Sequence, residues 1–75
     1  MQNTLSVMDT SGDTEYWWDV NKQDEIDIAR TVFKKFKKKN YLAYKIKSNG
    51  NKGELIKTFD ENAGKIILMP PVVGG

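Results

Sequence analysis

The residues best suited to chemistry stand at the end of the sequence, in the stretch Pro70-Pro71-Val72-Val73-Gly74-Gly75. Two adjacent glycines add nothing to packing, because they have no side chain and lose the most backbone entropy on ordering. They do allow a terminal carboxylate to enter a narrow active site of another protein. The four residues after the prolines reach on the order of 14 Å at ~3.3–3.6 Å each. The pattern predicts a tail that serves as a substrate of another protein; the alternative is a frayed terminus without a role.

The composition argues against catalysis by the chain itself. Its 75 residues make one domain. It has no cysteine and no histidine, which excludes a thiol nucleophile, thiolate metal sites and the commonest general base. We therefore expect no enzymatic activity, no cofactor and no metal.

Charge is unevenly distributed along the chain, although the net charge is only +2. Acidic residues concentrate in 9–27, and Arg30 with nine of the lysines falls in 30–57. Lysines interleaved with exposed aromatic residues can bind phosphates and stack bases, although no nucleic-acid-binding motif is present. The alternative is the solvated side of an amphipathic helix. The residues predicted to contact a partner are Trp17, Lys34, Lys35, Lys38, Lys45 and Lys47.

The adjacent pair Trp17-Trp18 must divide between two faces, because neighbouring residues of a strand point in opposite directions. Trp18 is predicted to lie in the core with Tyr16 and Val20. Trp17 is then either a contact for a partner or part of a packed sheet edge or hairpin.

Hydrophobic periodicity predicts the elements of the first half of the chain. Asn3–Met8 and Thr14–Val20 alternate as strands and form a hairpin around a glycine-containing turn. A helix follows over Lys22–Lys39, with Asn21 as N-cap, Asp24 completing an imperfect capping box, and Asn40 as a C-terminal stop. The predicted apolar stripe of this helix comprises Ile26, Ala29, Val32, Phe33 and Phe36, with Ile28 at its edge.

Three further strands are predicted after the helix. In Tyr41–Lys47 the side chains of Leu42, Tyr44 and Ile46 are expected to point inward, and those of Lys45 and Lys47 outward. Glu54–Phe59 is a shorter strand. Lys65–Met69 is apolar at consecutive positions, which predicts a central strand covered on both faces.

The predicted order ββαβββ defines an α+β domain over residues 1–71, followed by a tail at 72–75. One helix covers a mostly antiparallel sheet, and a compact sheet places the first and last strands side by side, which is the ubiquitin-like β-grasp arrangement. No apolar run is long enough to cross a membrane, and no signal-peptide pattern is present. The cytoplasm is the expected compartment.

The segment from Asp60 to Gly75 resembles the C-terminus of the MoaD/ThiS-type sulfur carriers, which are ubiquitin-like proteins ending in a turn, an apolar strand, Pro-Pro and Gly-Gly. This resemblance implies a β-grasp fold and an E1-like partner that adenylates the terminal glycine, which then carries sulfur as a thiocarboxylate. It assigns function to Gly74 and Gly75, with Pro70 and Pro71 positioning the tail.

The chain is also similar to small phage and prophage proteins that combine an aromatic strand, one helix, a Lys-Gly-Glu turn and a PPxxGG-like end. That resemblance implies no chemistry. It leaves open a small module that binds nucleic acid or protein, and a structural accessory protein with an inert tail.

Overall fold

The elements of the chain follow one another in the predicted order ββαβββ. The computed structural model describes residues 2–9, 11–46 and 53–71. Within these ranges the elements are β1 (Gln2–Asp9), β2 (Gly12–Asp19), α1 (Gln23–Lys38), β3 (Leu42–Lys45), β4 (Glu54–Ile56) and β5 (Lys65–Met69).

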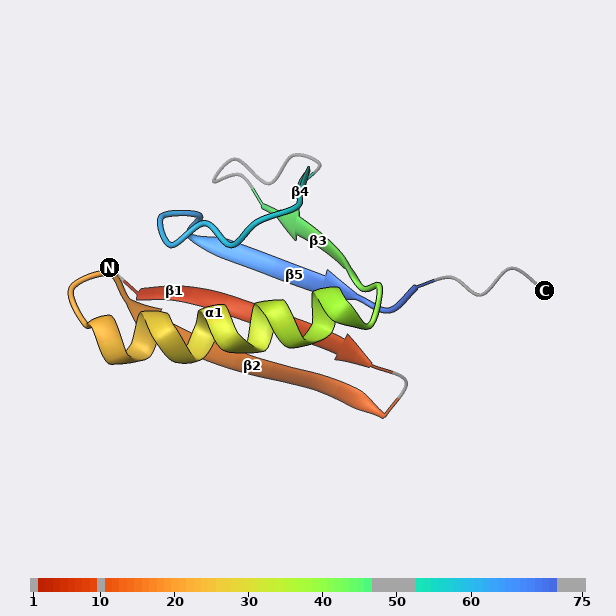
Figure 1. The fold of residues 1–75 in the computed structure, drawn as a ribbon, viewed down its shortest axis with the longest axis horizontal. Helices are drawn as coiled ribbons and strands as arrows, with labels where there is room; N and C mark the ends of the chain where they lie inside the picture. The colour runs from red at the N-terminus through yellow and green to blue at the C-terminus, as the bar shows by residue number, and fades with distance from the viewer. Residues whose placement is uncertain (1, 10, 47–52, 72–75) are drawn as a thin grey trace.

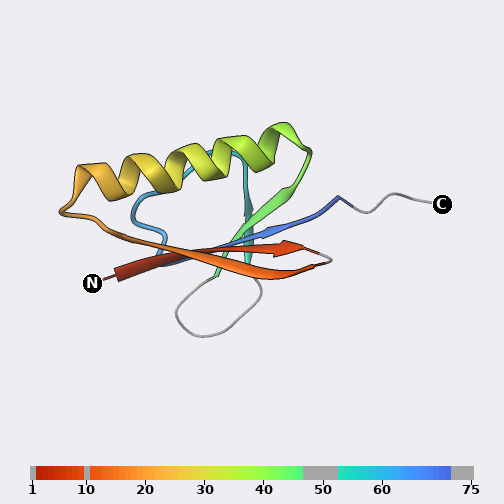
Figure 2. The same ribbon diagram turned by 90° about the horizontal axis from the view of Figure 1, so that it is seen from below.

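The strands form one mixed sheet in the order β2-β1-β5-β3-β4 (Figure 1). β1 and β5 pair in parallel at its centre, and the other neighbours are antiparallel. A tight turn cannot join parallel neighbours, so α1 and the β3–β4 hairpin lie between them in the sequence. α1 packs on one face of the sheet (Figure 2). The molecule is therefore a small α+β fold, and the predicted adjacency of the first and last strands is confirmed.

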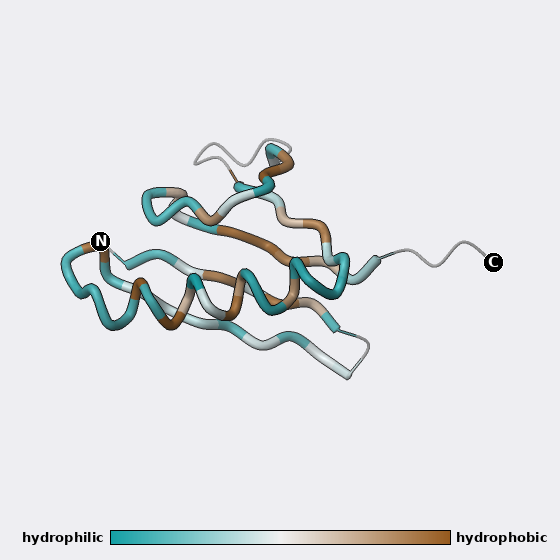
Figure 3. The backbone as a smooth tube through the Cα atoms, in the orientation of Figure 1, coloured by the Kyte–Doolittle hydropathy of each residue, from teal (hydrophilic) through white to brown (hydrophobic). Residues whose placement is uncertain are grey.

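The core lies between α1 and the central strands. Leu5 and Val7 of β1 stand opposite Ile66 and Leu68 of β5 in the parallel register, and all four are buried. In Figure 3 the apolar colour runs along β5 and recurs at intervals along α1. From the predicted stripe of α1, the residues Ile26, Ala29 and Phe33 are buried, and Val32 and Phe36 are partly buried. Ile28 is exposed, so the core does not include it.

Trp18 is the largest buried side chain, as its predicted place in the core requires. Its ring packs against Phe59 with centroids 5.1 Å apart. Tyr16, on the same face, is partly buried against the core. The prediction for Val20 is wrong: β2 ends at Asp19, and Val20 lies in the following turn with 37% of its surface exposed.

The start of α1 differs from the prediction. Its N-cap residue is Lys22, without a side-chain cap, so the predicted capping by Asn21 and Asp24 is wrong. Asp19 closes the turn before the helix instead, because its Oδ1 accepts a hydrogen bond from the backbone N–H of Asn21 at 2.8 Å. Glu25 Oε1 in turn accepts from the backbone N–H of Asp19 at 2.9 Å.

The end of α1 is built around Asn40, as predicted. Asn40 takes a left-handed conformation with φ of 66°. Its N–H donates to the carbonyl of Lys37 at 3.0 Å, and the N–H of Tyr41 donates to the carbonyl of Phe36 at 3.1 Å. These two bonds define a Schellman motif, and the Phe36 and Tyr41 rings, 4.9 Å apart, supply its apolar contact.

The face of β3 that points toward the helix is the opposite of the predicted one. Ala43 is fully buried opposite Leu68, whereas Leu42 is 39% exposed. The cause is the contact of Tyr41 with Phe36, which directs Tyr41 toward the helix. Strand alternation then places Ala43 on the helix side and Leu42 and Tyr44 on the other face.

β5 is central, as predicted, but only one of its faces is covered in the described part of the chain. Ile66 and Leu68 lie beneath α1 and are fully buried. Lys65, Ile67 and Met69 face away from the helix, and Met69 is 42% exposed. The sheet therefore keeps a face opposite α1 that carries apolar side chains.

Candidate functional site

β5 brings the chain to the proline pair at one end of the sheet. Its ladder with β3 ends at Met69, and Pro70 and Pro71 have no N–H to extend it. Pro70 is half-buried and Pro71 is exposed. The predicted activation residues Gly74 and Gly75 lie outside the described residues. The structure therefore places Pro70 and Pro71, which directly follow the end of a central strand.

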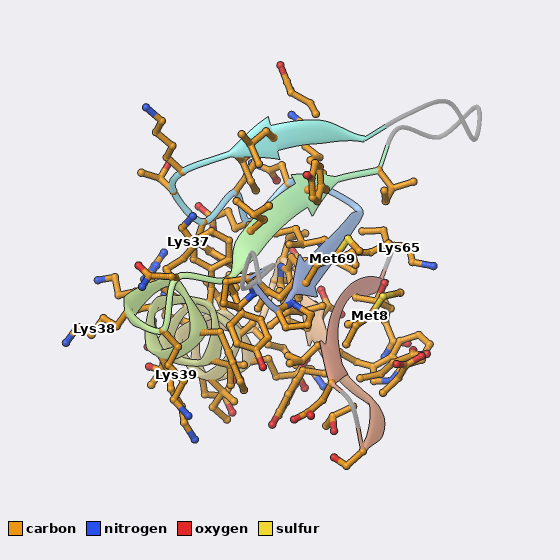
Figure 4. All side chains as sticks on the ribbon, turned by 90° about the vertical axis from the view of Figure 1, so that its right-hand side faces the viewer. Met8, Lys37, Lys38, Lys39, Lys65 and Met69 are labelled. Carbon is orange, nitrogen blue, oxygen red and sulfur yellow. The ribbon has the colours of Figure 1, made fainter. Side chains whose placement is uncertain are left out.

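The end of the molecule at which β5 finishes is also the end at which β1 and α1 finish (Figure 1). Figure 4 looks onto this end: Met69 marks the end of β5, Lys37, Lys38 and Lys39 lie to one side of it, and Met8 and Lys65 lie to the other. The end of β5 is therefore flanked by a cationic helix end and by the sheet face that carries Met8 and Met69.

The predicted lysine cluster lies on the solvent side of the last turns of α1. Lys34, Lys35 and Lys38 are all exposed. No carboxylate in the described ranges forms a salt bridge with any of them. The Nζ atoms of Lys35 and Lys39 lie 5.7 and 5.4 Å from the centroid of the Phe36 ring. This helix end carries positive charge that the described part of the fold does not neutralise.

The other two predicted lysines do not extend this cluster. Lys45 lies on the helix side of β3, so its predicted outward orientation is wrong. Its Nζ lies 3.3 Å from Asp60 Oδ2 and 3.7 Å from Glu54 Oε2, which compensates its charge within the fold. Lys47 is outside the described residues.

A groove beside the lysine cluster was not anticipated from the sequence. It has a volume of about 350 Å³, and it lies between α1 and the segment that follows β4. The predicted strand ended at Phe59, whereas β4 ends at Ile56 and the chain then turns toward the helix. The residues that line the groove are Phe33, Lys34, Lys37, Lys38, Lys57, Thr58 and Phe59.

Trp17 and the lysine cluster lie on opposite sides of the molecule. Trp17 is 56% exposed on the edge strand β2. Since Trp18 is buried beneath α1, strand alternation directs Trp17 away from the helix. Of the predicted contact residues, Trp17 therefore lies on one surface, and Lys34, Lys35 and Lys38 lie on another.

The sheet face opposite α1 is the second apolar feature that the sequence prediction missed. Leu42 and Leu55 are 39% and 53% exposed, and both belong to this face. A hollow of about 270 Å³ beside them is lined by Tyr44, Ile46, Gly53, Ile67 and Met69. The wrong inward direction assigned to β3 concealed this surface, because three of its apolar residues were expected in the core.

Comparisons of this chain with protein-family models, curated proteins and solved structures find no match. The helix of the described part is neither long nor apolar enough to cross a membrane. Across residues 2–9, 11–46 and 53–71, His, Cys, Asp and Glu side chains form no group of three that could hold a metal ion.

Proposed function

We propose that this protein is a ubiquitin-like carrier or modifier of the β-grasp type, activated at Gly75 by an E1-like enzyme. The observation that carries the proposal is the course of β5. The strand pairs in parallel with β1 at the centre of the sheet, with one helix across it, and leads directly into Pro70-Pro71. The fold thereby anchors the base of the PPVVGG sequence, so that a partner can bind the residues beyond the proline pair.

The proposed reaction needs a free carboxylate on Gly75, whether the gene or later processing provides it. The carboxylate oxygen attacks the α-phosphorus of ATP, forming an acyl-adenylate and releasing pyrophosphate. In a sulfur carrier, hydrosulfide then attacks the acyl carbon of Gly75, the bond from that carbon to the phosphate oxygen breaks, and AMP leaves, so that the chain ends in a thiocarboxylate. The chain has neither cysteine nor histidine, so the partner supplies the catalytic groups, while Gly74 and Gly75 add no Cβ to obstruct its channel.

Intact-mass spectrometry tests the proposal. The mature protein is incubated with Mg²⁺, ATP and an E1-like enzyme from the same organism, and its mass is recorded before and after addition of a sulfur donor. The expected result is an added AMP, followed by replacement of one oxygen by sulfur. A variant lacking Gly74 and Gly75 is the control and should show neither change. A mature protein that does not end at Gly75, or no adduct with any such enzyme, overturns the proposal.

A second candidate function is a small binding module with an inert tail. The exposure of Leu42, Leu55 and Met69 on one sheet face favours it, since contiguous exposed apolar surface marks interaction sites. In that case a variant without Gly74 and Gly75 binds its partner as well as the full chain does. If the partner is a nucleic acid, its affinity must fall steeply with salt.

A further inference from the structure

The groove between α1 and the segment 57–59 has an apolar floor and a cationic rim. Phe33 and Phe59 form the floor; Phe33 is only 2% exposed, and Phe59 is partly buried. The lysines of the rim are Lys34, Lys37, Lys38 and Lys57. Their hydrocarbon stems add to the apolar wall, while their ammonium groups remain in water. Such a groove fits a ligand that is apolar at its centre and anionic around it.

The charge of the rim is not neutralised from within the described part of the chain. The salt bridges there use Lys22, Arg30 and Lys45, and none uses a lysine of the rim. Lys37 donates to the backbone carbonyl of Tyr41 at 3.3 Å, a contact that leaves its positive charge uncompensated. Figure 4 shows Lys37 and Lys38 projecting from the end of α1. The complementary partner is therefore negatively charged.

The floor distinguishes between two kinds of anionic partner. Base stacking on a nucleic-acid-binding protein needs a free aromatic face. The Phe59 ring instead packs edge-on to Phe33 at 5.7 Å and tilted against Trp18 at 5.1 Å, and the Arg30 guanidinium lies 5.8 Å from its centroid. Three neighbours thus already engage the Phe59 ring, which makes it a poor platform for a base, whereas the space of about 350 Å³ can take an inserted side chain.

We propose that this groove binds an acidic peptide segment that inserts one large apolar side chain onto Phe33 and Phe59 and places its carboxylates among Lys34, Lys37, Lys38 and Lys57. The segment belongs to a protein partner. The interaction is independent of Gly74 and Gly75 and holds whether or not the tail is activated.

A fluorescent peptide tests the proposal with the full chain. The probe is a short run of Asp and Glu around one Phe, and matched peptides replace the Phe by Ala or the acidic residues by Asn and Gln. Fluorescence anisotropy should show binding of the first peptide that weakens about tenfold or more without the Phe and is lost without the carboxylates. Binding should also weaken as salt rises.

Two double variants provide the matched control, because each removes the same charge. Lys37→Gln with Lys57→Gln alters the groove, and Lys35→Gln with Lys39→Gln alters lysines that do not line it. The first should weaken the Phe peptide about fivefold to tenfold and the second by less than about twofold. Thermal melts establish that both variants are folded.

Three results overturn the proposal. Equal loss in the two double variants indicates a diffuse basic surface and no specific groove. Equal binding of the Phe and Ala peptides removes the role of the floor. Tighter binding of single-stranded poly-dT than of every peptide, lost in the groove variant, assigns the groove to nucleic acid.

Discussion

The indole Nε1 of Trp18 donates a hydrogen bond to the backbone carbonyl of Glu61 at 3.0 Å, across 43 positions of sequence. The same carbonyl accepts a second bond from Asn3 Nδ2 at 3.2 Å. One oxygen thus joins β1 and β2 to the turn before β5. Because Phe59 packs on the Trp18 ring, this junction also holds part of the floor of the groove between α1 and the segment 57–59.

Trp18→Phe should destabilise the fold strongly. The change removes a buried hydrogen bond and leaves unfilled space beneath α1, which together cost about 2–3 kcal/mol. Typical figures give a chain of this length roughly 4–11 kcal/mol in total, so the melting temperature should fall by about 10–20 °C. Circular dichroism during thermal unfolding measures the shift.

The neighbouring Trp17→Phe is the matched control, and its effect should stay within about 0.5 kcal/mol because Trp17 is exposed. Similar losses in both variants would contradict the assigned roles.

Gly53→Ala should destabilise the β3–β4 hairpin through a collision. A Cβ at this position would stand 2.9 Å from Ile46 Cδ1 and 3.1 Å from both the Lys45 carbonyl oxygen and Tyr44 Cβ. The side chain of Ile46 can move, but the backbone oxygen cannot, so we expect a loss of about 1–3 kcal/mol. Urea denaturation measures it.

Adding Ile46→Val to Gly53→Ala provides the internal check on this collision. Valine lacks the Cδ1 atom that approaches most closely, so the double variant should recover part of the loss. The two changes should then be less than additive. Strict additivity would show that the contact does not cause the destabilisation.

The element order could be predicted from the sequence because each strong element carries its own periodic signal. Leu5 and Val7 alternate with polar neighbours, the apolar stripe of α1 has helical spacing, and β5 is apolar from Ile66 to Met69. The adjacency of the first and last strands followed from the requirement for a compact sheet. The direction of β3 could not be obtained in this way, because both faces of Tyr41–Ile46 carry apolar residues. The contact between Tyr41 and Phe36, which depends on how the helix ends, decides that direction.

The candidate site was predictable only where a single segment defines it. The run Lys34–Lys39 and the proline pair are visible in the sequence, and so is the division of an adjacent tryptophan pair between two faces. The groove is different, because Phe33 and Phe59 meet only after the chain leaves β4 at Ile56 and turns toward α1. A strand pattern continuing to Phe59 gave no sign of that turn. Tertiary packing therefore adds a feature that no local pattern contains.

Asn40 offers a substitution that should stabilise the protein. Its left-handed conformation, with φ of 66°, carries little cost for glycine and a larger one for residues with a plain Cβ. Asn40→Gly should therefore match or exceed the stability of the natural chain, and Asn40→Ala should lose about 1 kcal/mol. Lys39→Ala serves as the control, since Lys39 has a φ of −91° that alanine adopts freely. Thermal unfolding ranks the variants, and a more stable alanine than glycine at position 40 would contradict the Schellman assignment.

The two carboxylates near Lys45 should contribute unequally to stability. Asp60 lies nearer, at 3.3 Å against 3.7 Å for Glu54, and its side chain is 37% exposed against 58%. Exposed ion pairs are worth about 0.2–1 kcal/mol, and screening weakens the more solvated one further. A double-mutant cycle of Lys45→Met with Asp60→Asn should give a coupling near the upper figure, and one with Glu54→Gln a coupling near the lower. The cycle is needed because Asp60 also accepts the backbone N–H of Asn62 at 2.9 Å, so a single substitution there disturbs the turn as well. When both cycles are repeated in high salt, the coupling energy of Lys45 with Glu54 should fall by a larger fraction than that with Asp60. Equal coupling energies at low salt would show that Lys45 has no preferred partner.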